Sequence, residues 1–294
     1  MVAATKRKLI SDDAIVVVFD TSPIRNLAHS TEPEWVSIFS RMREDGYSFS
    51  LSDAATAELL VQVRSNRIPR DGYERMIGLC KTFLNEHIPM IPGKIDLEAI
   101  IGINNDPEFI EETKHLSHQA WRQLQNPLSV YPHFGPSLEE LLDEERDEWG
   151  NFLYRIAEIS LSYGIDKLES DPEKAHEPLA TLLGKHSFIK AEIEPSMSVR
   201  MHLETRYRLR QMFRSAKLRE AYSPRSKKNR NDGIDVDMFR YLILPAFVIA
   251  EDSGFFDSLQ GIESFQRDWF IRPEELARRW INGERPRPEW PVET

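Results

Sequence analysis

Short apolar runs alternate with amphipathic stretches over the first hundred residues. Residues 14–19 (Ala-Ile-Val-Val-Val-Phe) form an uninterrupted run of strand length, which is typical of a parallel strand covered on both faces. The predicted strands cover 14–19, 47–51 and 88–91, and the predicted helices cover 35–44, 54–63 and 73–86. Because strands and helices alternate in this way, the pattern predicts an α/β sheet fold.

Capping residues mark several of the predicted helix starts. Pro23 suits the first turn of a further helix after the first strand, with Thr21 or Ser22 as its cap. Ser52 or Asp53 can cap the helix at 54–63. Near the carboxyl end, residues 273–283 begin with Pro-Glu-Glu and end with Gly, which are good start and stop signals for a helix.

The pattern changes in the middle of the chain. From 94 to about 226 we find mainly helical periodicity and no convincing strand. Alternation resumes afterwards: helices are predicted at 232–244 and 255–259, and strands at 247–250 and 268–271. We therefore predict a discontinuous α/β domain with a mainly helical insertion or subdomain and two tails. The domain covers 13–95 and 229–285, the insertion 96–228, and the tails 1–12 and 286–294.

Composition restricts the class of protein. The chain has 294 residues, of which 40% are hydrophobic and 29% charged, a globular composition. The single cysteine, Cys80, excludes an intramolecular disulfide and any multi-cysteine metal site, and its apolar helical surroundings predict an inert buried thiol. The longest apolar run, 241–250, is too short to span a bilayer. Leu9 and Ile10 are followed at once by polar residues, so we expect no signal peptide, no membrane partner and a cytoplasmic location.

Four acidic residues are predicted to lie at strand ends or adjoining helix starts: Asp20, Glu58, Asp232 and Asp252. The carboxyl ends of parallel strands meet at one edge of a sheet, so these side chains are expected to converge. Converging carboxylates repel one another, and one or two hard divalent cations, Mg²⁺ or Mn²⁺, are the usual remedy. Such ions activate water and neutralise phosphate charge, so phosphodiester hydrolysis follows as the reaction class.

Neighbouring acids leave part of this set open. Asp235 is a further candidate metal ligand, since it shares a helix face with Asp232 at i and i+3. Asp237 is also available there. Glu251 and Asp257 compete with Asp252.

Charge is unevenly distributed along the chain. The formal net charge is −10, yet residues 200–230 hold eleven basic residues and two acidic ones. The helical part of this segment is expected either to follow a phosphate backbone or to pair with the acidic stretch 139–148. The basic loop before Asp232 is the better candidate for substrate binding, because it leads directly into the site. Its candidate substrate-binding residues are Arg225, Lys227, Lys228 and Arg230.

Several segments, in this order, resemble the PIN-domain nuclease family. They are 16–22 (Val-Val-Val-Phe-Asp-Thr-Ser) with Leu27, 50–59, Asn231-Asp232, 249–255 and 269–276. The resemblance implies a PIN-like three-layer fold with a central parallel sheet flanked by helices, a Mg²⁺ or Mn²⁺ site and usually an RNA substrate. It also implies that Asp20, Glu58, Asp232 and Asp252 are the acidic set, with Ser22 and Asn231 in support. The long insertion is a departure from the family.

The sequence therefore predicts a divalent-metal-dependent endoribonuclease. A DNA nuclease of the flap type is the alternative within the same chemistry, because the same acids serve either sugar. A catalytically silent PIN-like module that binds RNA or protein is the alternative from another class. A protein partner or a second copy of the chain is left open by the sequence.

Overall fold

The computed structural model describes the greater part of the two predicted domain segments and little of the range between them. The described residues are 9–29, 31–93, 106–128, 140, 142–144, 146–151, 203–204, 207, 223, 231–262 and 264–289. The chain divides into two compact units. The first unit comprises Met1–Gly135, Arg240–Asp252 and Asp268–Thr294, and the second comprises Pro136–Phe239 and Ser253–Arg267.

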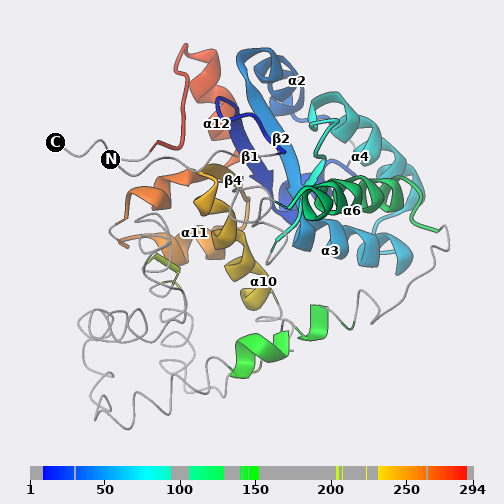
Figure 1. Ribbon diagram of the computed structural model, residues 1–294. Coiled ribbons are helices and arrows are strands. Elements are labelled where there is room, and N and C mark those ends of the chain that lie inside the picture. The colour runs from blue at the N-terminus through cyan, green and yellow to red at the C-terminus, as the bar shows by residue number, and fades with distance from the viewer. Residues whose placement is uncertain are drawn as a thin grey trace, which may run out of the picture. The chain divides into compact units, whose positions relative to one another are not determined.

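A five-stranded parallel sheet forms the centre of the first unit (Figure 1). Its strands are β1 (Ile15–Phe19), β2 (Tyr47–Ser52), β3 (Met90–Ile91), β4 (Ala246–Ile249) and β5 (Phe270–Ile271). They lie in the order β3-β2-β1-β4-β5, and every neighbouring pair is parallel. The predicted α/β class and the central parallel sheet are thus confirmed.

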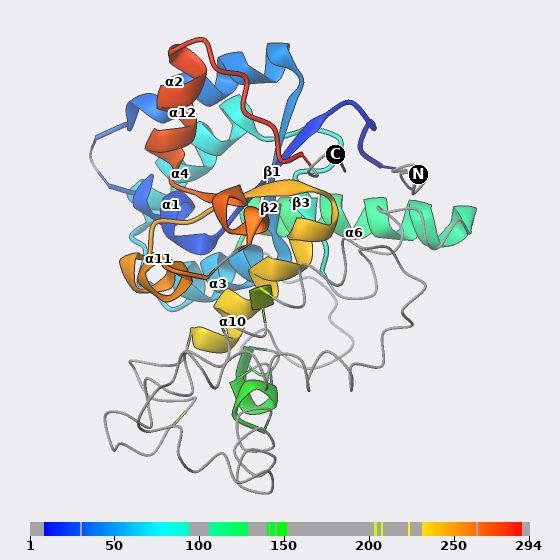
Figure 2. The same ribbon diagram turned by 90° about the vertical axis from the view of Figure 1, so that its left-hand side faces the viewer.

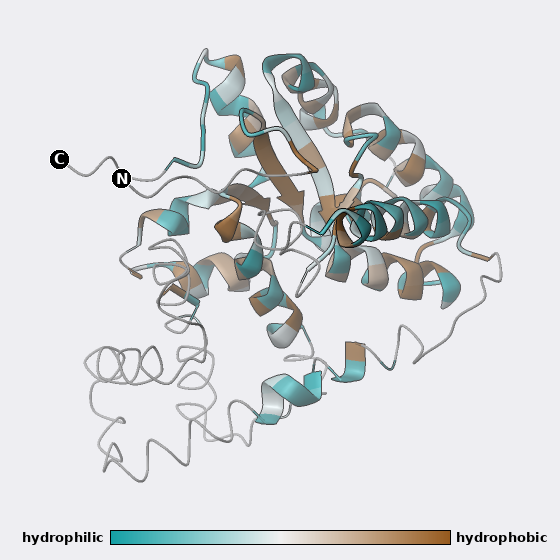
Figure 3. Cartoon of the chain, viewed as in Figure 1, coloured by the Kyte–Doolittle hydropathy of each residue, from teal (hydrophilic) through white to brown (hydrophobic). Residues whose placement is uncertain are grey.

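β1 lies at the centre of this sheet. Val17 is in register with Phe49 of β2 on one side and with Phe247 of β4 on the other. All five residues of β1 are buried, which explains why its sequence is apolar without interruption; the strand is brown in Figure 3. The chain runs from β1 to β2 in one direction and later adds β4 on the opposite side. The strand order therefore reverses between β1 and β4, and this topological switch point is where open α/β sheets place their ligands.

Aromatic side chains pack between the sheet and its helices. Phe19 and Phe49 contact Phe39 of α2 (Glu34–Met42) and Phe83 of α4 (Arg70–Phe83). Trp35 of α2 completes this cluster and is almost fully buried. α12 (Pro273–Ile281) lies alongside α2, as Figure 2 shows. Edge and tilted ring contacts of this kind add to the stabilisation from apolar burial.

The remaining helices of the first unit are α1 (Thr21–Asn26), α3 (Asp53–Arg64) and α6 (Pro107–Gln125). α3 contacts both α1 and α6. α6 lies in the range predicted as an insertion, and it packs against α3 and β3. The Ser117 hydroxyl donates to the Met90 carbonyl oxygen (2.6 Å) and accepts from the Met90 N–H (3.2 Å), so α6 is hydrogen-bonded to β3.

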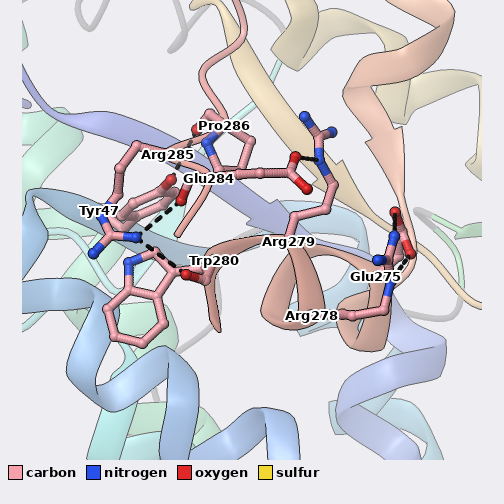
Figure 4. A network of polar contacts seen from close by, with 8 residues as sticks. All are labelled: Tyr47, Glu275, Arg278, Arg279, Trp280, Glu284, Arg285 and Pro286. Atoms are coloured by element: carbon pink, nitrogen blue, oxygen red, sulfur yellow. Dashed lines mark hydrogen bonds and ion pairs between the residues drawn. The ribbon is translucent and has the colours of Figure 1, made fainter. Parts of the chain in front are cut away.

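The segment after α12 packs near the start of β2 (Figure 4). The Tyr47 hydroxyl donates to the Pro286 carbonyl oxygen (2.8 Å). Asp45 accepts from the Trp280 indole N–H (2.8 Å) and pairs with Arg285, whose guanidinium also stacks on the Trp280 ring. Asp45 precedes β2 and Tyr47 begins it. These contacts therefore lie at the amino end of the strand, away from the carboxyl edge of the sheet.

The second unit is described mainly around three aromatic side chains. Tyr207, Phe239 and Phe255 contact one another. Phe255 belongs to α11 (Ser253–Leu259), and Phe239 belongs to η4 (Met238–Ile243), a 3₁₀ helix that follows α10 (Asp232–Asp237). A second 3₁₀ helix, η5 (Phe265–Trp269), leads towards β5.

Several local predictions need correction. Neither Thr21 nor Ser22 caps α1, because Asp20 is its N-cap residue. The helix predicted at 232–244 is a six-residue α-helix followed by the 3₁₀ helix η4. Ser52, rather than Asp53, caps α3 by accepting from the Ala55 N–H (3.0 Å). Of the helices that the structure describes, none combines the length and apolar character needed to cross a bilayer.

Candidate functional site

Asp20 lies at the carboxyl end of β1, at the switch point. Its N–H donates to the Ile249 carbonyl oxygen (2.9 Å), which continues the pairing of β1 with β4 by one residue. Its carboxylate Oδ2 accepts from the Ser22 N–H (3.4 Å) and so caps α1. The side chain is buried, with 9% of the residue exposed. Asp20 therefore serves as a helix cap and also places a carboxylate at the edge of the sheet.

The electrostatic surroundings raise the pKa of Asp20. Burial is the main cause, since removal from water disfavours the charged form. The backbone N–H groups of Thr21 and Ser22 and the charge of Arg25 act in the opposite direction. The carboxylate of Asp252 raises the pKa further, so the two acids lie within electrostatic reach of each other. A cation bound between them would relieve this repulsion.

Asp252 and Glu58 belong to the segments that follow β4 and β2, the two strands on either side of β1. Asp252 follows β4, the strand next to β1 at the switch point, and is exposed. Glu58 lies on α3, which begins directly after β2, and only 8% of it is exposed. The Thr21 hydroxyl donates to Glu58 Oε2 (2.5 Å). Thr21, the residue that follows Asp20, therefore connects the end of β1 to Glu58 of α3.

The donor atoms at this edge suit a hard cation. Asp20, Asp252 and Glu58 offer carboxylate oxygens, the ligands preferred by Mg²⁺ and Mn²⁺. Within the described ranges, no three Asp, Glu, His or Cys side chains gather closely enough to hold one ion. Mg²⁺ commonly binds proteins through one or two carboxylates and keeps several waters.

The other predicted site residues lie elsewhere in the chain. Asp232 and Asp235 are half-buried residues of the first turn of α10, in the second unit, and Asn231 precedes them and is exposed. The arrangement of four acids in one site therefore stays a prediction. Arg225, Lys227, Lys228 and Arg230 lie outside the described residues. The Ser22 backbone N–H donates to Asp20, and a supporting role for the Ser22 side chain stays a prediction.

A hydrogen-bonded network around Asp53 was not predicted. Asp53 Oδ1 accepts from the Tyr241 hydroxyl (2.8 Å), and Oδ2 accepts from the Gly93 N–H (3.0 Å). The Tyr241 hydroxyl also lies 3.1 Å from the Ile91 carbonyl oxygen. The network ties the start of α3 to the end of β3 and to the segment before β4. Only the position of Asp53 directly after a strand could have indicated it.

Glu251 is a second unpredicted participant, beside the carboxyl end of β4. The Asn26 side-chain amide of α1 donates to Glu251 Oε2, and Arg272 donates to the Glu251 carbonyl oxygen (2.8 Å). Burial raises the pKa of Glu251, and the charge of Glu274 adds to that rise. Glu251 was considered only as an alternative to Asp252, whereas the structure gives the two residues different surroundings.

No family model, curated protein or solved structure matches this chain.

Proposed function

We propose that the protein is a divalent-metal-dependent nuclease that hydrolyses phosphodiester bonds of RNA. Asp20 and Asp252 would hold the ion, and Glu58 would supply a further carboxylate. Asp232 and Asp235 are the additional ligands that the sequence suggests. The proposed fold is PIN-like, and the cytoplasm is the expected location.

One observation carries the proposal. Asp20, a buried carboxylate whose pKa is raised mainly by burial, ends β1 at the topological switch point, and the charge of Asp252, which follows the neighbouring strand β4, adds a smaller part to that rise. Retaining two repelling carboxylates at a ligand-binding edge is unfavourable for the protein alone. A cation bound there would offset the repulsion, and an acid with a raised pKa in such a place is typical of functional sites.

The metal ion and the protein would contribute differently to the reaction. A bound Mg²⁺ or Mn²⁺ supplies charge neutralisation at the phosphate and makes water a better nucleophile at neutral pH. The chain contributes orientation. The Ser22 N–H fixes the Asp20 carboxylate, and the Thr21 hydroxyl holds Glu58 in one orientation. Both contacts are formed within the protein alone, so the acids are arranged before a substrate binds.

The choice of RNA rests on the PIN-like sequence segments and on the basic stretch 200–230. Phosphate contacts from that stretch would give affinity without base recognition. Flap-type DNA cleavage is the alternative, because the carboxylates act on the phosphate and not on the sugar.

Incubation of the purified protein with end-labelled RNA and DNA, with and without Mn²⁺, tests the proposal. We expect Mn²⁺-dependent cleavage of RNA, loss of cleavage in Asp20→Asn and Asp252→Asn, and full activity in Asp71→Asn. Asp71 is an exposed residue of the first turn of α4 and provides the control for removal of one negative charge. Absence of metal-stimulated cleavage by the wild type, or equal cleavage by Asp20→Asn, would overturn the proposal. Preference for DNA would favour the flap-type alternative.

A further inference from the structure

The carboxylates of the candidate site create a problem for any phosphodiester substrate, because they repel its negative charge. A metal ion offsets part of this repulsion. A positively charged side chain beside the acids would offset more, and guanidinium groups match the geometry of phosphate oxygens by donating two parallel hydrogen bonds. An arginine close to Asp20 could therefore take part in substrate binding.

Arg25 occupies such a place. It belongs to the last turn of α1, the short helix that begins directly after Asp20. The next residue, Asn26, donates a hydrogen bond to Glu251, so this end of α1 lies against the segment that follows β4. Arg25 is therefore flanked by the carboxyl ends of β1 and β4, on the two sides of the switch point.

The charge of Arg25 reaches both sides. Burial raises the pKa of Asp20 and that of Glu251, and the charge of Arg25 opposes both rises, which places the guanidinium within electrostatic range of the acids that follow β1 and β4. For both acids the effect of burial is larger than that of Arg25, so the pKa stays raised. Among the described residues, Arg25 is the cation whose charge acts on both acids.

The guanidinium is not engaged by these acids. Arg25 is half-exposed, and its side chain forms no hydrogen bond or ion pair with any residue in the described ranges. Neighbouring arginines differ in this respect. Arg75 donates to the Ala28 carbonyl oxygen at the end of α1, and Arg272 donates to the Glu251 carbonyl oxygen. Those two donate to the backbone, whereas the side-chain donors of Arg25 have no partner among the residues that the structure describes.

We propose that Arg25 binds a phosphate of the nucleic-acid substrate beside Asp20 and Asp252. The inference rests on the proposed function and extends it, because it assigns a substrate-binding residue within the first unit. Arg25 would donate hydrogen bonds to non-bridging phosphate oxygens and would hold the phosphate next to the carboxylates. It gives affinity and position and reads no base.

Binding is measured first, in the absence of cleavage. Fluorescence anisotropy of a fluorescein-labelled single-stranded RNA is recorded with the Asp20→Asn protein and with the same protein carrying Arg25→Ala, Arg25→Lys or Arg70→Ala. Arg70 is an exposed arginine of α4 paired with Glu74, so its removal changes the net charge equally. We expect Arg25→Ala to weaken binding about tenfold and to reduce the salt dependence by about one released counterion. The affinity of the Arg25→Lys protein should lie between those of the Asp20→Asn protein and the Arg25→Ala protein. The Arg70→Ala protein should bind RNA as tightly as the Asp20→Asn protein does.

Thermal unfolding of each variant confirms that it is folded. If Arg25→Ala binds RNA as tightly as Arg70→Ala, with the same salt dependence, the inference about Arg25 is wrong. Cleavage by the protein with Asp20 intact decides the proposed function separately. A wild type that cleaves RNA while Arg25→Ala binds and cleaves normally would overturn the inference and leave the nuclease proposal standing. A wild type that cleaves neither RNA nor DNA would overturn the nuclease proposal, whatever the binding result.

Discussion

The hydroxyl of Thr21 donates a hydrogen bond to Oε2 of Glu58, and both residues are buried. The contact joins the residue that follows Asp20 at the end of β1 to the helix that follows β2. Thr21 thereby links the segment that begins with Asp20 to Glu58 of α3. A buried carboxylate that loses such a donor is left with a large desolvation cost.

Replacing Thr21 with Val is therefore expected to lower the free energy of unfolding by about 1–3 kcal/mol, because the donor disappears while the shape is kept. Thr21→Ser keeps the hydroxyl and should recover most of this loss. Urea denaturation at pH 7 measures both. If both variants had the same free energy of unfolding as the wild type, the hydrogen bond would have no stabilising role.

The close approach of α4 to α1 depends on Gly72. A Cβ built at Gly72 would lie 2.7 Å from the Ala28 carbonyl oxygen, whereas one built at Gly78, in the same helix, meets nothing within 4 Å. We expect Gly72→Ala to destabilise the protein by about 1–3 kcal/mol, because backbone must move. Gly78→Ala should stabilise it by about 0.5–1 kcal/mol through helix propensity. Thermal and urea unfolding test this pair, and equal shifts of the same sign would contradict it.

Asp53 and Tyr241 are expected to be energetically coupled. Tyr241→Phe removes the hydroxyl that donates to Asp53 Oδ1, and Asp53→Asn alters the acceptor. A double-mutant cycle should give a coupling of about 0.5–3 kcal/mol, as is found for residues in one hydrogen-bonded network. Tyr73→Phe serves as a control, because the Tyr73 hydroxyl donates to the Leu124 carbonyl oxygen instead. Additive effects of the first pair would show that the network contributes nothing cooperative.

The raised pKa of Asp20 makes stability depend on pH in a definite direction. The folded protein binds this proton more tightly than the unfolded chain, whose aspartate has its usual pKa of 3.8. The contribution of Asp20 to stability therefore falls as pH rises above 3.8 and through the folded-state pKa. Asp20→Asn avoids this loss and keeps a good helix cap, since Asn caps as well as Asp.

In metal-free buffer at pH 7, we expect Asp20→Asn to be more stable than the wild type by about 1 kcal/mol, a gain typical of relieving a functional residue. The difference should shrink as pH falls towards 4. Denaturation curves at several pH values, with Asp71→Asn as the control, measure it. An Asp20→Asn protein that is less stable at pH 7 would show that the carboxylate is stabilised in the fold rather than strained.

Much of the first unit could be predicted from local pattern alone. The apolar run at 14–19, the turn residues after it and the start and stop signals of the last helix indicate β1, α1 and α12 because each depends on a few neighbouring residues. The alternation of strands and helices indicates a parallel sheet but leaves the strand order open, including which side of β1 receives β4. The shortness of β3 and β5 could not be predicted, because strand ends depend on the pairing partner.

Contacts between distant side chains were harder to anticipate. Asp20 and Asp252 could be placed at one edge because parallel strands end there. The hydroxyl of Thr21 was overlooked in favour of Ser22, since both follow Asp20 and only their direction from the backbone separates them. Asp53 was interpreted as a cap because its partners, Gly93 and Tyr241, lie 40 and 188 residues away in the sequence. Sequence proximity carries no signal for such pairs.

Calorimetric titration of metal-free protein with Mn²⁺ tests the central claim most directly, since it asks whether the acids at the switch point hold a cation. We predict that the wild type and Asp71→Asn bind Mn²⁺ with the same affinity, and that Asp20→Asn and Asp252→Asn each bind at least about tenfold more weakly. Unchanged affinity in both site variants, or no Mn²⁺ binding by the folded wild type, would contradict the account.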